Sequence, residues 1–161
     1  MMDESYPLYL ANRPLCPNTA NAVMDKFTGG EATRTPLADA ALIDKGIGAA
    51  VEAVPAMREL RPYERAEILR HCVGEFERRS EELAAILRTE AGKPIRDSRG
   101  EVDRLIDTFA IAAREALQPH GEMLNLEISE RSRGYRGFAK RVPVGACSFI
   151  TPFNFPLNLV A

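Results

Sequence analysis

Cysteine and histidine, the residues that most often supply a nucleophilic thiolate or a zinc ligand, are few in this chain. They are three cysteines and two histidines: Cys16, Cys72, Cys147, His71 and His120. His71 and Cys72 are neighbours, but without further ligands close in sequence they indicate no four-ligand zinc site. An odd number of distant cysteines fits a reducing compartment better than a disulfide framework. The sequence therefore predicts neither a metal centre nor a disulfide scaffold.

The composition is that of a chain that can bury a hydrophobic core and has no strong excess of charge. Of its 161 residues, 45% are hydrophobic and 27% are charged, with a formal net charge of −2. Both signs are mixed along the sequence, so the broad positive field of a nucleic-acid-binding protein is missing. The apolar runs are short, and residues 1–10 carry acidic residues where a signal peptide is basic. We expect a cytoplasmic protein with neither nucleic acid nor membrane as partner.

Hydrophobic periodicity predicts four amphipathic helices in the middle of the chain. The first follows a capping Asp39 and is expected to end at Pro55. The second begins at Pro62, a residue suited to the first helical turn. The third runs from Ser80 to a stop at Gly92, and the fourth follows it.

The apolar stripes of these helices define the expected core. In the second helix the stripe consists of Ile68, Leu69, Cys72, Val73 and Phe76. In the fourth it consists of Val102, Leu105, Ile106, Phe109 and Ala113. Cys72 is therefore interpreted as a core residue. The charged residues of the fourth helix are interpreted as a solvated face: Arg99, Glu101, Asp103, Arg104 and Asp107.

Outside the helices, several segments have the pattern of strands. Apolar patches at residues 8–10 and 23–24 could pair as edge strands, and two glycines at 29–30 mark a turn. Residues 134–142 have the mixed polar pattern of a ribbon or edge strand. Residues 144–150, VGACSFI, form an apolar run typical of a strand covered on both faces.

The end of the sequence predicts a turn over residues 151–155 and a helix that opens at Pro156. A buried strand of the parallel type needs neighbouring strands, and this sequence offers one good candidate. Domain boundaries usually fall in polar, flexible segments, whereas the last residues here are apolar. We therefore expect sequence outside this chain to complete the core. The alternative is a complete small helical protein with an apolar tail.

The run PVGACSFITPFNFP, residues 143–156, resembles the signature of the aldehyde dehydrogenase superfamily, in which a strand leads into a proline–aromatic–asparagine turn. The resemblance is supported by TEAGKP at residues 89–94, by Arg65 with Leu69, and by the helix–strand order. It implies an α/β fold, namely an incomplete Rossmann-like cofactor-binding domain of the aldehyde dehydrogenase fold. Its helix-rich N-terminal part would span residues 1–133.

The resemblance also divides the remaining residues. It implies an oligomerisation ribbon strand at residues 134–142, and a first cofactor-cleft strand with the start of the next helix at 143–161. The catalytic domain, with the family's nucleophilic cysteine and general-base glutamate, would lie in sequence that this chain does not contain. Cys147 falls within the predicted strand and is interpreted as structural. We expect this chain alone to be inactive.

The function implied by the resemblance is the oxidation of a small aldehyde to a carboxylate with NAD or NADP, through a cysteine thiohemiacetal. Asn154 matches the family asparagine whose amide helps to form the oxyanion hole, where a fixed donor stabilises the alkoxide. Cofactor-cleft positions of the family are matched by Ile150, Thr151, Pro152 and Phe153. Alternatively, Asn154 caps a helix or sits in a tight turn, and Ile150 and Phe153 pack in a core.

Three further expectations depend on the same resemblance. The family often has tryptophan at the position of Phe153, and phenylalanine there resembles subgroups that act on small hydroxy-, phospho- or semialdehydes. The full-length enzyme is expected to be a homo-oligomer. The alternatives are an acylating, CoA-dependent aldehyde dehydrogenase, and a non-catalytic truncated module that binds intact subunits through residues 134–142.

Overall fold

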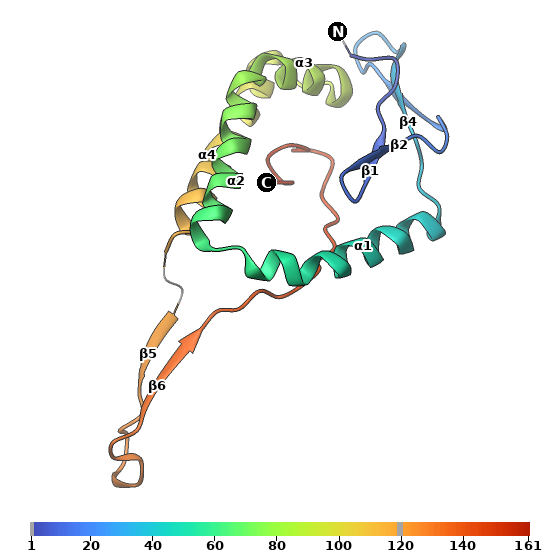
Figure 1. Ribbon diagram of the computed structural model, residues 1–161. Coiled ribbons are helices and arrows are strands. Elements are labelled where there is room, and N and C mark those ends of the chain that lie inside the picture. Colours follow the sequence, from blue (N-terminus) through green and yellow to red (C-terminus); the bar gives the residue numbers. More distant parts are fainter. Residues whose placement is uncertain (1, 119–120) are drawn as a thin grey trace.

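The computed structural model describes residues 2–118 and 121–161. In these residues four short strands precede four helices, and a hairpin follows them (Figure 1). The elements are β1 (Leu8–Leu10), β2 (Arg13–Leu15), β3 (Asn21–Met24), β4 (Glu31–Thr35), α1 (Ala40–Glu59), α2 (Pro62–Arg78), α3 (Ser80–Ala91), α4 (Ile95–Glu115), β5 (Gly121–Asn125), the short 3-10 helix η1 (Glu130–Ser132) and β6 (Arg136–Lys140).

The strands of the described residues pair as three separate antiparallel hairpins: β1–β2, β3–β4 and β5–β6. The predicted pairing of residues 8–10 with 23–24 is therefore wrong, because β1 pairs with β2 and β3 pairs with β4. Ala11 and Asn12 have φ values of 49° and 61°, the left-handed conformation that a two-residue hairpin turn needs. Closing so short a loop costs less chain entropy than joining more distant segments.

The helices begin where capping residues predict. The carboxylate of Asp39 accepts a hydrogen bond of 2.8 Å from the backbone N–H of Leu42, at the start of α1. Pro62 opens α2, and α3 ends before Gly92, whose φ of 68° is left-handed. These local signals are short in sequence, so they specify helix starts and stops without help from the rest of the fold.

Helix α1 differs from the prediction because it continues through Pro55 to Glu59. Proline lacks an N–H and so leaves the carbonyl of Val51 without its usual helical donor, but the helix continues for another turn. The carbonyl groups at the end of the helix are free in any helix, and here the guanidinium of Arg65 donates to the carbonyl oxygens of Met57 at 2.9 Å and Leu60 at 3.1 Å. One side chain of α2 thus binds the end of α1.

The most buried residues lie where α4 packs against α2 and α3. The buried hydrophobic side chains are Ala66, Ala84, Leu87, Val102, Leu105 and Ala113. Phe76 and Phe109 meet edge to face, with ring centroids 5.0 Å apart. Cys72, which was expected in the core, is only partly buried, and Ile68 is 50% exposed. The apolar side chains of Ile43, Ile47 and Val51 in α1 are also exposed, and α1 has no buried residue.

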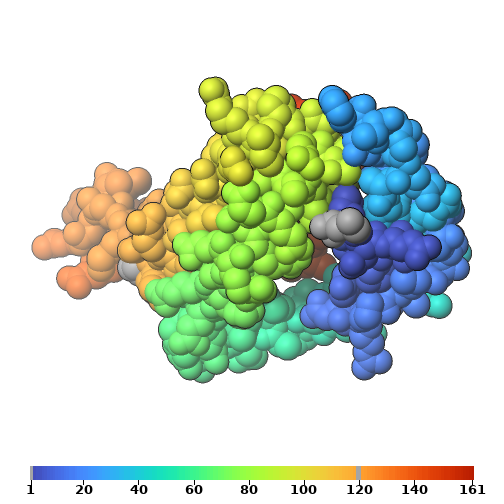
Figure 2. Space-filling model, turned by 90° about the horizontal axis from the view of Figure 1, so that it is seen from above, coloured from blue at the N-terminus to red at the C-terminus, as the bar shows by residue number. Residues whose placement is uncertain are grey.

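The β5–β6 hairpin projects away from the helices (Figure 1). Figure 2 shows it on one side of the helical body, with the N-terminal strands on the other side. β6 lies within residues 134–142, the segment whose pattern predicts an extended ribbon. Phe138 and Met123 face each other in the register and are 83% and 84% exposed. The hairpin therefore presents apolar side chains outside the core.

The predicted core strand at residues 144–150 is not a strand in the structure. Among the described residues, the segment after β6 carries no strand, and residues 141–155 are all exposed. The physical reason is that no neighbouring strand lies beside it, so its backbone has no ladder to join. The helix expected after Pro156 is represented only by turns, with N–H groups of Leu159 and Ala161 bonded to the carbonyls of Phe155 and Leu157.

Candidate functional site

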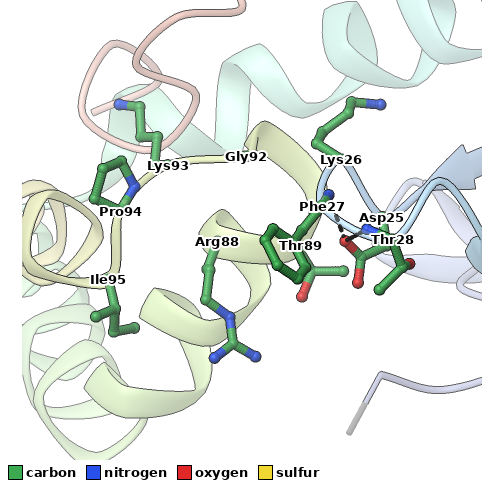
Figure 3. A pocket seen from close by; sticks show the side chains of 10 residues that line it. All are labelled: Asp25, Lys26, Phe27, Thr28, Arg88, Thr89, Gly92, Lys93, Pro94 and Ile95. Atoms are coloured by element: carbon green, nitrogen blue, oxygen red, sulfur yellow. Dashed lines mark hydrogen bonds between the residues drawn. The ribbon is translucent and has the colours of Figure 1, made fainter.

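The two motifs that carry the sequence resemblance, residues 89–94 and 143–156, meet in the structure. The ammonium group of Lys93, from the first motif, lies 3.9 Å from the ring centroid of Phe155, from the second. The guanidinium carbon of Arg104 lies 5.6 Å from the same centroid. A cation at such a distance is attracted to the face of an aromatic ring. Figure 3 shows the Lys93 side chain reaching toward the C-terminal segment, whereas Arg88 points away from it.

Glu101 is the second link between the motifs, and the sequence did not predict it. Its side chain is buried, at 2% exposure, and forms an ion pair with Lys93. The Oε1 atom accepts hydrogen bonds from the backbone N–H groups of Leu157 at 2.9 Å and Asn158 at 3.2 Å. The prediction that Glu101 belongs to a solvated face is therefore wrong. A buried charge is tolerated here because every partner it needs is present.

The hydrogen bonds of Glu101 keep it ionised. Burial raises the pKa of the carboxyl, but the hydrogen bonds from Lys93 and from the N–H groups of Leu157 and Asn158 lower it by more. The pKa of Glu101 is therefore below the ordinary value for glutamate. At neutral pH the group is a carboxylate that holds a lysine and two backbone amides at once.

Leu157 adds an apolar anchor to these polar contacts. Its side chain packs against the buried cluster of Ala84, Leu87 and Val102. Glu101 precedes Val102 in α4, so the apolar and polar anchors of the segment lie on adjacent residues of one helix. The C-terminal segment is thus fixed at residues 157 and 158, which directly follow the signature turn.

The predicted site residues form one exposed stretch before this anchor. They are Ile150, Thr151, Pro152, Phe153 and Asn154, and all are exposed. Ile150 is 99% exposed and Phe153 is 92% exposed, which argues against core packing as their role in this structure. The structure therefore brings the five residues together in sequence order but encloses none of them.

The alternative role of Asn154 as a helix cap is not seen. A capping side chain binds the N–H groups two or three residues later. Those residues are Pro156, which has no N–H, and Leu157, whose N–H donates to Glu101. The amide of Asn154 is thus left out of the cap.

Residues 143–147 lie along α1, and together they line a hollow of about 300 Å³ with Val54, Met57 and Arg65 among the walls. Cys147 is exposed here, and its thiol lies 3.6 Å from the carbonyl oxygen of Gly145. The prediction that Cys147 lies in a buried strand is therefore wrong, whereas the prediction that it is not the nucleophile is not tested by this structure.

A larger hollow, of about 640 Å³, lies between the β3–β4 turn and the α3–α4 junction (Figure 3). At its rim the N–H of Lys26 donates to the carbonyl of Thr89 at 3.1 Å. A Cβ atom added to Gly92 would lie 2.9 Å from the Cβ of Lys26. This close approach fixes the junction from which Lys93 extends.

No group of three or more His, Cys, Asp or Glu side chains in residues 2–118 and 121–161 could hold a metal ion. His120, one of the sequence candidates, lies outside the described residues. In the same residues, no helix has both the length and the apolar character needed to cross a membrane.

The sequence of this chain is similar to those of known proteins over most of its length. Residues 16–161 match the model of the aldehyde dehydrogenase family. The 3-sulfolactaldehyde dehydrogenase of Priestia megaterium is 41% identical over 138 residues, which are 86% of this chain and 28% of that protein. The chain therefore spans less than a third of this relative.

Solved structures share the fold. The crystal structure of aldehyde dehydrogenase 21 from Physcomitrella patens, in complex with the reaction product succinate, has a TM-score of 0.94 and 43% identity, over 99% of this chain and 34% of that one. Glyceraldehyde-3-phosphate dehydrogenase GapN from Methanocaldococcus jannaschii, complexed with NADP, has a TM-score of 0.72 and 26% identity, over 89% and 30%. With the α/β fold class confirmed in this way, and with both signature motifs in contact, the chain belongs to the aldehyde dehydrogenase family.

Proposed function

We propose that this chain is the N-terminal part of an enzyme that oxidises a small aldehyde to a carboxylate with NAD or NADP. Asn154 supplies one hydrogen-bond donor of the oxyanion hole. The observation that carries this proposal is that Glu101 accepts hydrogen bonds from the backbone N–H groups of residues 157 and 158. The side-chain amide of Asn154 is therefore not needed as a cap and can donate to another partner. A site residue exposed on a fixed turn is the arrangement that such a donor needs.

The role of Asn154 follows from where charge develops in the reaction. When a thiolate attacks the aldehyde carbon, a C–S bond forms and the carbonyl electrons move to oxygen. The amide N–H of Asn154 donates to that oxygen more strongly as an alkoxide than as a neutral carbonyl, so it lowers the barrier to attack. An amide suits this position because it donates without titrating. The thiolate itself comes from sequence outside residues 1–161.

Residues 150–153 fit the nicotinamide end of a dinucleotide. Ile150 and Phe153 offer exposed apolar faces, and no charged side chain lies between them in the sequence. A bound nicotinamide cofactor supplies the acceptor for the hydride of the aldehyde carbon. The NADP complex of the Methanocaldococcus jannaschii enzyme supports a cofactor of this class. Thr151 and Pro152 would contribute backbone groups and shape at the same edge.

The proposed substrates are small aldehydes that carry a hydroxyl or an anionic group. Phe153 is the residue of this chain that favours them, at a position where the family often has tryptophan. The relatives support the same class, since they are named for 3-sulfolactaldehyde and glyceraldehyde-3-phosphate, and a third holds the product succinate. A carboxylate product in that third enzyme also favours acid formation over release of a thioester.

The proposal is tested with the family-length protein, meaning residues 1–161 together with the chain that completes the aldehyde dehydrogenase fold. NAD(P)H formation is followed with lactaldehyde, glyceraldehyde-3-phosphate and succinic semialdehyde, with hexanal as an apolar control. We expect turnover with at least one of the first three and a carboxylate as product. No reduction of NAD or NADP with any of them would refute the proposal, and a product formed only with CoA would identify the acylating alternative.

The isolated chain is the matched control for this assay. It contains Asn154 but neither the family nucleophile nor the family base, so we expect no NAD(P)H above background. Turnover by residues 1–161 alone would contradict the assignment of catalysis to a site shared with further sequence.

A further inference from the structure

We infer that Glu101 is a positioning residue of the active site: it holds the turn that carries Asn154 through the backbone N–H groups of Leu157 and Asn158. This inference rests on the proposed function of Asn154. Glu101 itself contacts no reacting atom, since its partners are Lys93 and the backbone N–H groups of Leu157 and Asn158. It acts on the path of the backbone, and through that path on the place where the Asn154 amide is held.

Glu101 replaces a local cap at the start of the turns that follow Pro156. The first turn after Pro156 has free N–H groups, as every helical turn does at its start. Both N–H groups named above donate to the same carboxylate oxygen, 56 and 57 residues away in the sequence. The cap therefore comes from α4 and not from the signature segment. Its removal would take away the polar anchor of the segment and leave the apolar packing of Leu157.

The same carboxylate also helps to hold Phe155, the residue before Pro156. Its Oε2 atom pairs with Lys93, and the Lys93 ammonium lies over the ring of Phe155. Phe155 directly follows Asn154. One buried ion pair thus holds the residue after Asn154 through a ring contact, and the residues after Pro156 through two hydrogen bonds.

Glu101 and Lys93 both belong to well-packed parts of the backbone. Glu101 and Val102 are 2% and 1% exposed in the middle of α4, which packs against α2 and α3. Lys93 follows Gly92, whose close approach to Lys26 fixes the α3–α4 junction. Both charged partners therefore start from parts of the backbone that cannot shift independently of the core.

These contacts predict an effect on turnover that differs from a loss of stability. A displacement of a reacting group by about 1 Å can cost up to about 10²-fold in rate. Loss of the Glu101 cap should therefore lower kcat while the KM for the aldehyde changes little. The effect should depend on Asn154, because that residue is what the cap positions.

The experiment is a double-mutant cycle in the family-length protein. Glu101→Met keeps the length of the side chain but removes both acceptors, and Glu101→Gln keeps an acceptor for the two N–H groups. We expect Glu101→Met to lower kcat about 10- to 100-fold and Glu101→Gln to recover much of the loss. In the Asn154→Ala background, Glu101→Met should change kcat by less than about twofold, because coupled residues are not additive.

The outcomes separate this inference from the proposed function. If Asn154→Ala leaves kcat unchanged, the role of Asn154 is wrong. If Asn154→Ala lowers kcat but Glu101→Met lowers it equally in both backgrounds, or not at all, the positioning role is wrong. Should Glu101→Met fail to fold, Glu101→Asp takes its place, since it keeps the charge and shortens the arm by one methylene.

A control variant tests whether any lost ion pair would have the same effect. Glu81→Gln removes the charge from the exposed pair between Glu81 and Arg99, and Arg99 lies two residues before Glu101 in α4. We expect kcat within about twofold of the unmodified protein, because exposed ion pairs contribute little. An effect as large as that of Glu101→Met would overturn the argument from burial and position.

Discussion

The backbone N–H of Leu157 donates a 2.9 Å hydrogen bond to the carboxylate of Glu101, 56 residues earlier in the chain. This bond ties the segment that carries Asn154 to helix α4. Together with the Lys93–Glu101 ion pair, it explains why two motifs far apart in the sequence are needed at one place in the fold.

Gly92 tests the α3–α4 junction. Its φ of +68° is strained for any residue with a Cβ, and that Cβ would lie 2.9 Å from Lys26. We expect Gly92→Ala to lower the free energy of unfolding by about 1–3 kcal/mol. The matched control is Gly74→Ala in α2, where nothing lies within 4 Å. There alanine should raise stability by about 0.5–1 kcal/mol. Urea unfolding measures both, and equal effects would contradict the prediction.

The ion pair of Glu101 predicts a pH dependence of stability. Because the folded-state pKa of Glu101 lies below its value in the unfolded chain, about 4.3, the unfolded state takes up the proton first as pH falls. The stabilisation from this group is therefore fully present above the unfolded pKa and is lost as pH falls through the folded pKa. The free-energy gap between the unmodified protein and Glu101→Gln should be large at pH 7 and smaller at pH 3.5.

Urea unfolding at the two pH values checks this sign. Glu75, Glu81 and Glu82 also have lowered pKa values, from hydrogen bonds to Arg78, Arg99 and Arg79. They are present in both proteins, so the comparison cancels them. A gap that stays constant, or grows toward acid, would show that Glu101 does not stabilise the fold as a carboxylate.

The β5–β6 hairpin predicts an interface between subunits. Phe138 is 83% exposed on a hairpin that projects from the body. We expect Phe138→Asp to lower the oligomeric state of the family-length protein, measured by sedimentation velocity, because it places a charge in an apolar contact. Tyr63→Asp, on an exposed aromatic of α2, is the control and should leave the assembly unchanged. An unchanged oligomeric state with Phe138→Asp would contradict the prediction that the hairpin forms an interface.

The sequence predicted the parts of the fold that depend on neighbours in the chain. The Asp39 cap, the Pro62 start and the Gly92 stop are decided within a few residues, so they could be predicted without knowing the tertiary structure. Pro55 misled the prediction because the loss of one backbone N–H did not end the helix, which continues to Glu59. The apolar run 144–150 was assigned to a strand, but a strand needs partners that the described residues do not provide.

The site was predicted only in part for the same reason. The motif identified Asn154 and its neighbours. The role of Glu101 depends on Lys93, 8 residues before it, and on Leu157, 56 residues after it, so it could not be predicted from adjacent residues. One signal was available. Glu101 lies four residues before Leu105, a member of the apolar stripe that the sequence predicts, so the two residues share a face of the helix. A glutamate that is buried on such a face needs a partner for its charge.

The central claim, that Asn154 donates to the developing oxyanion, is tested most directly by the kcat of Asn154→Ala in the family-length protein. By analogy with other single oxyanion-hole donors, we expect kcat to fall about 10²–10³-fold. The dissociation constant of the cofactor, measured by titration of the same protein, should stay within about twofold. Asn158→Ala, an asparagine of the same segment whose contact with Glu101 is through its backbone, is the control and should retain most of its kcat. An unimpaired kcat for Asn154→Ala, or a loss that appears only as weaker cofactor binding, would contradict the account.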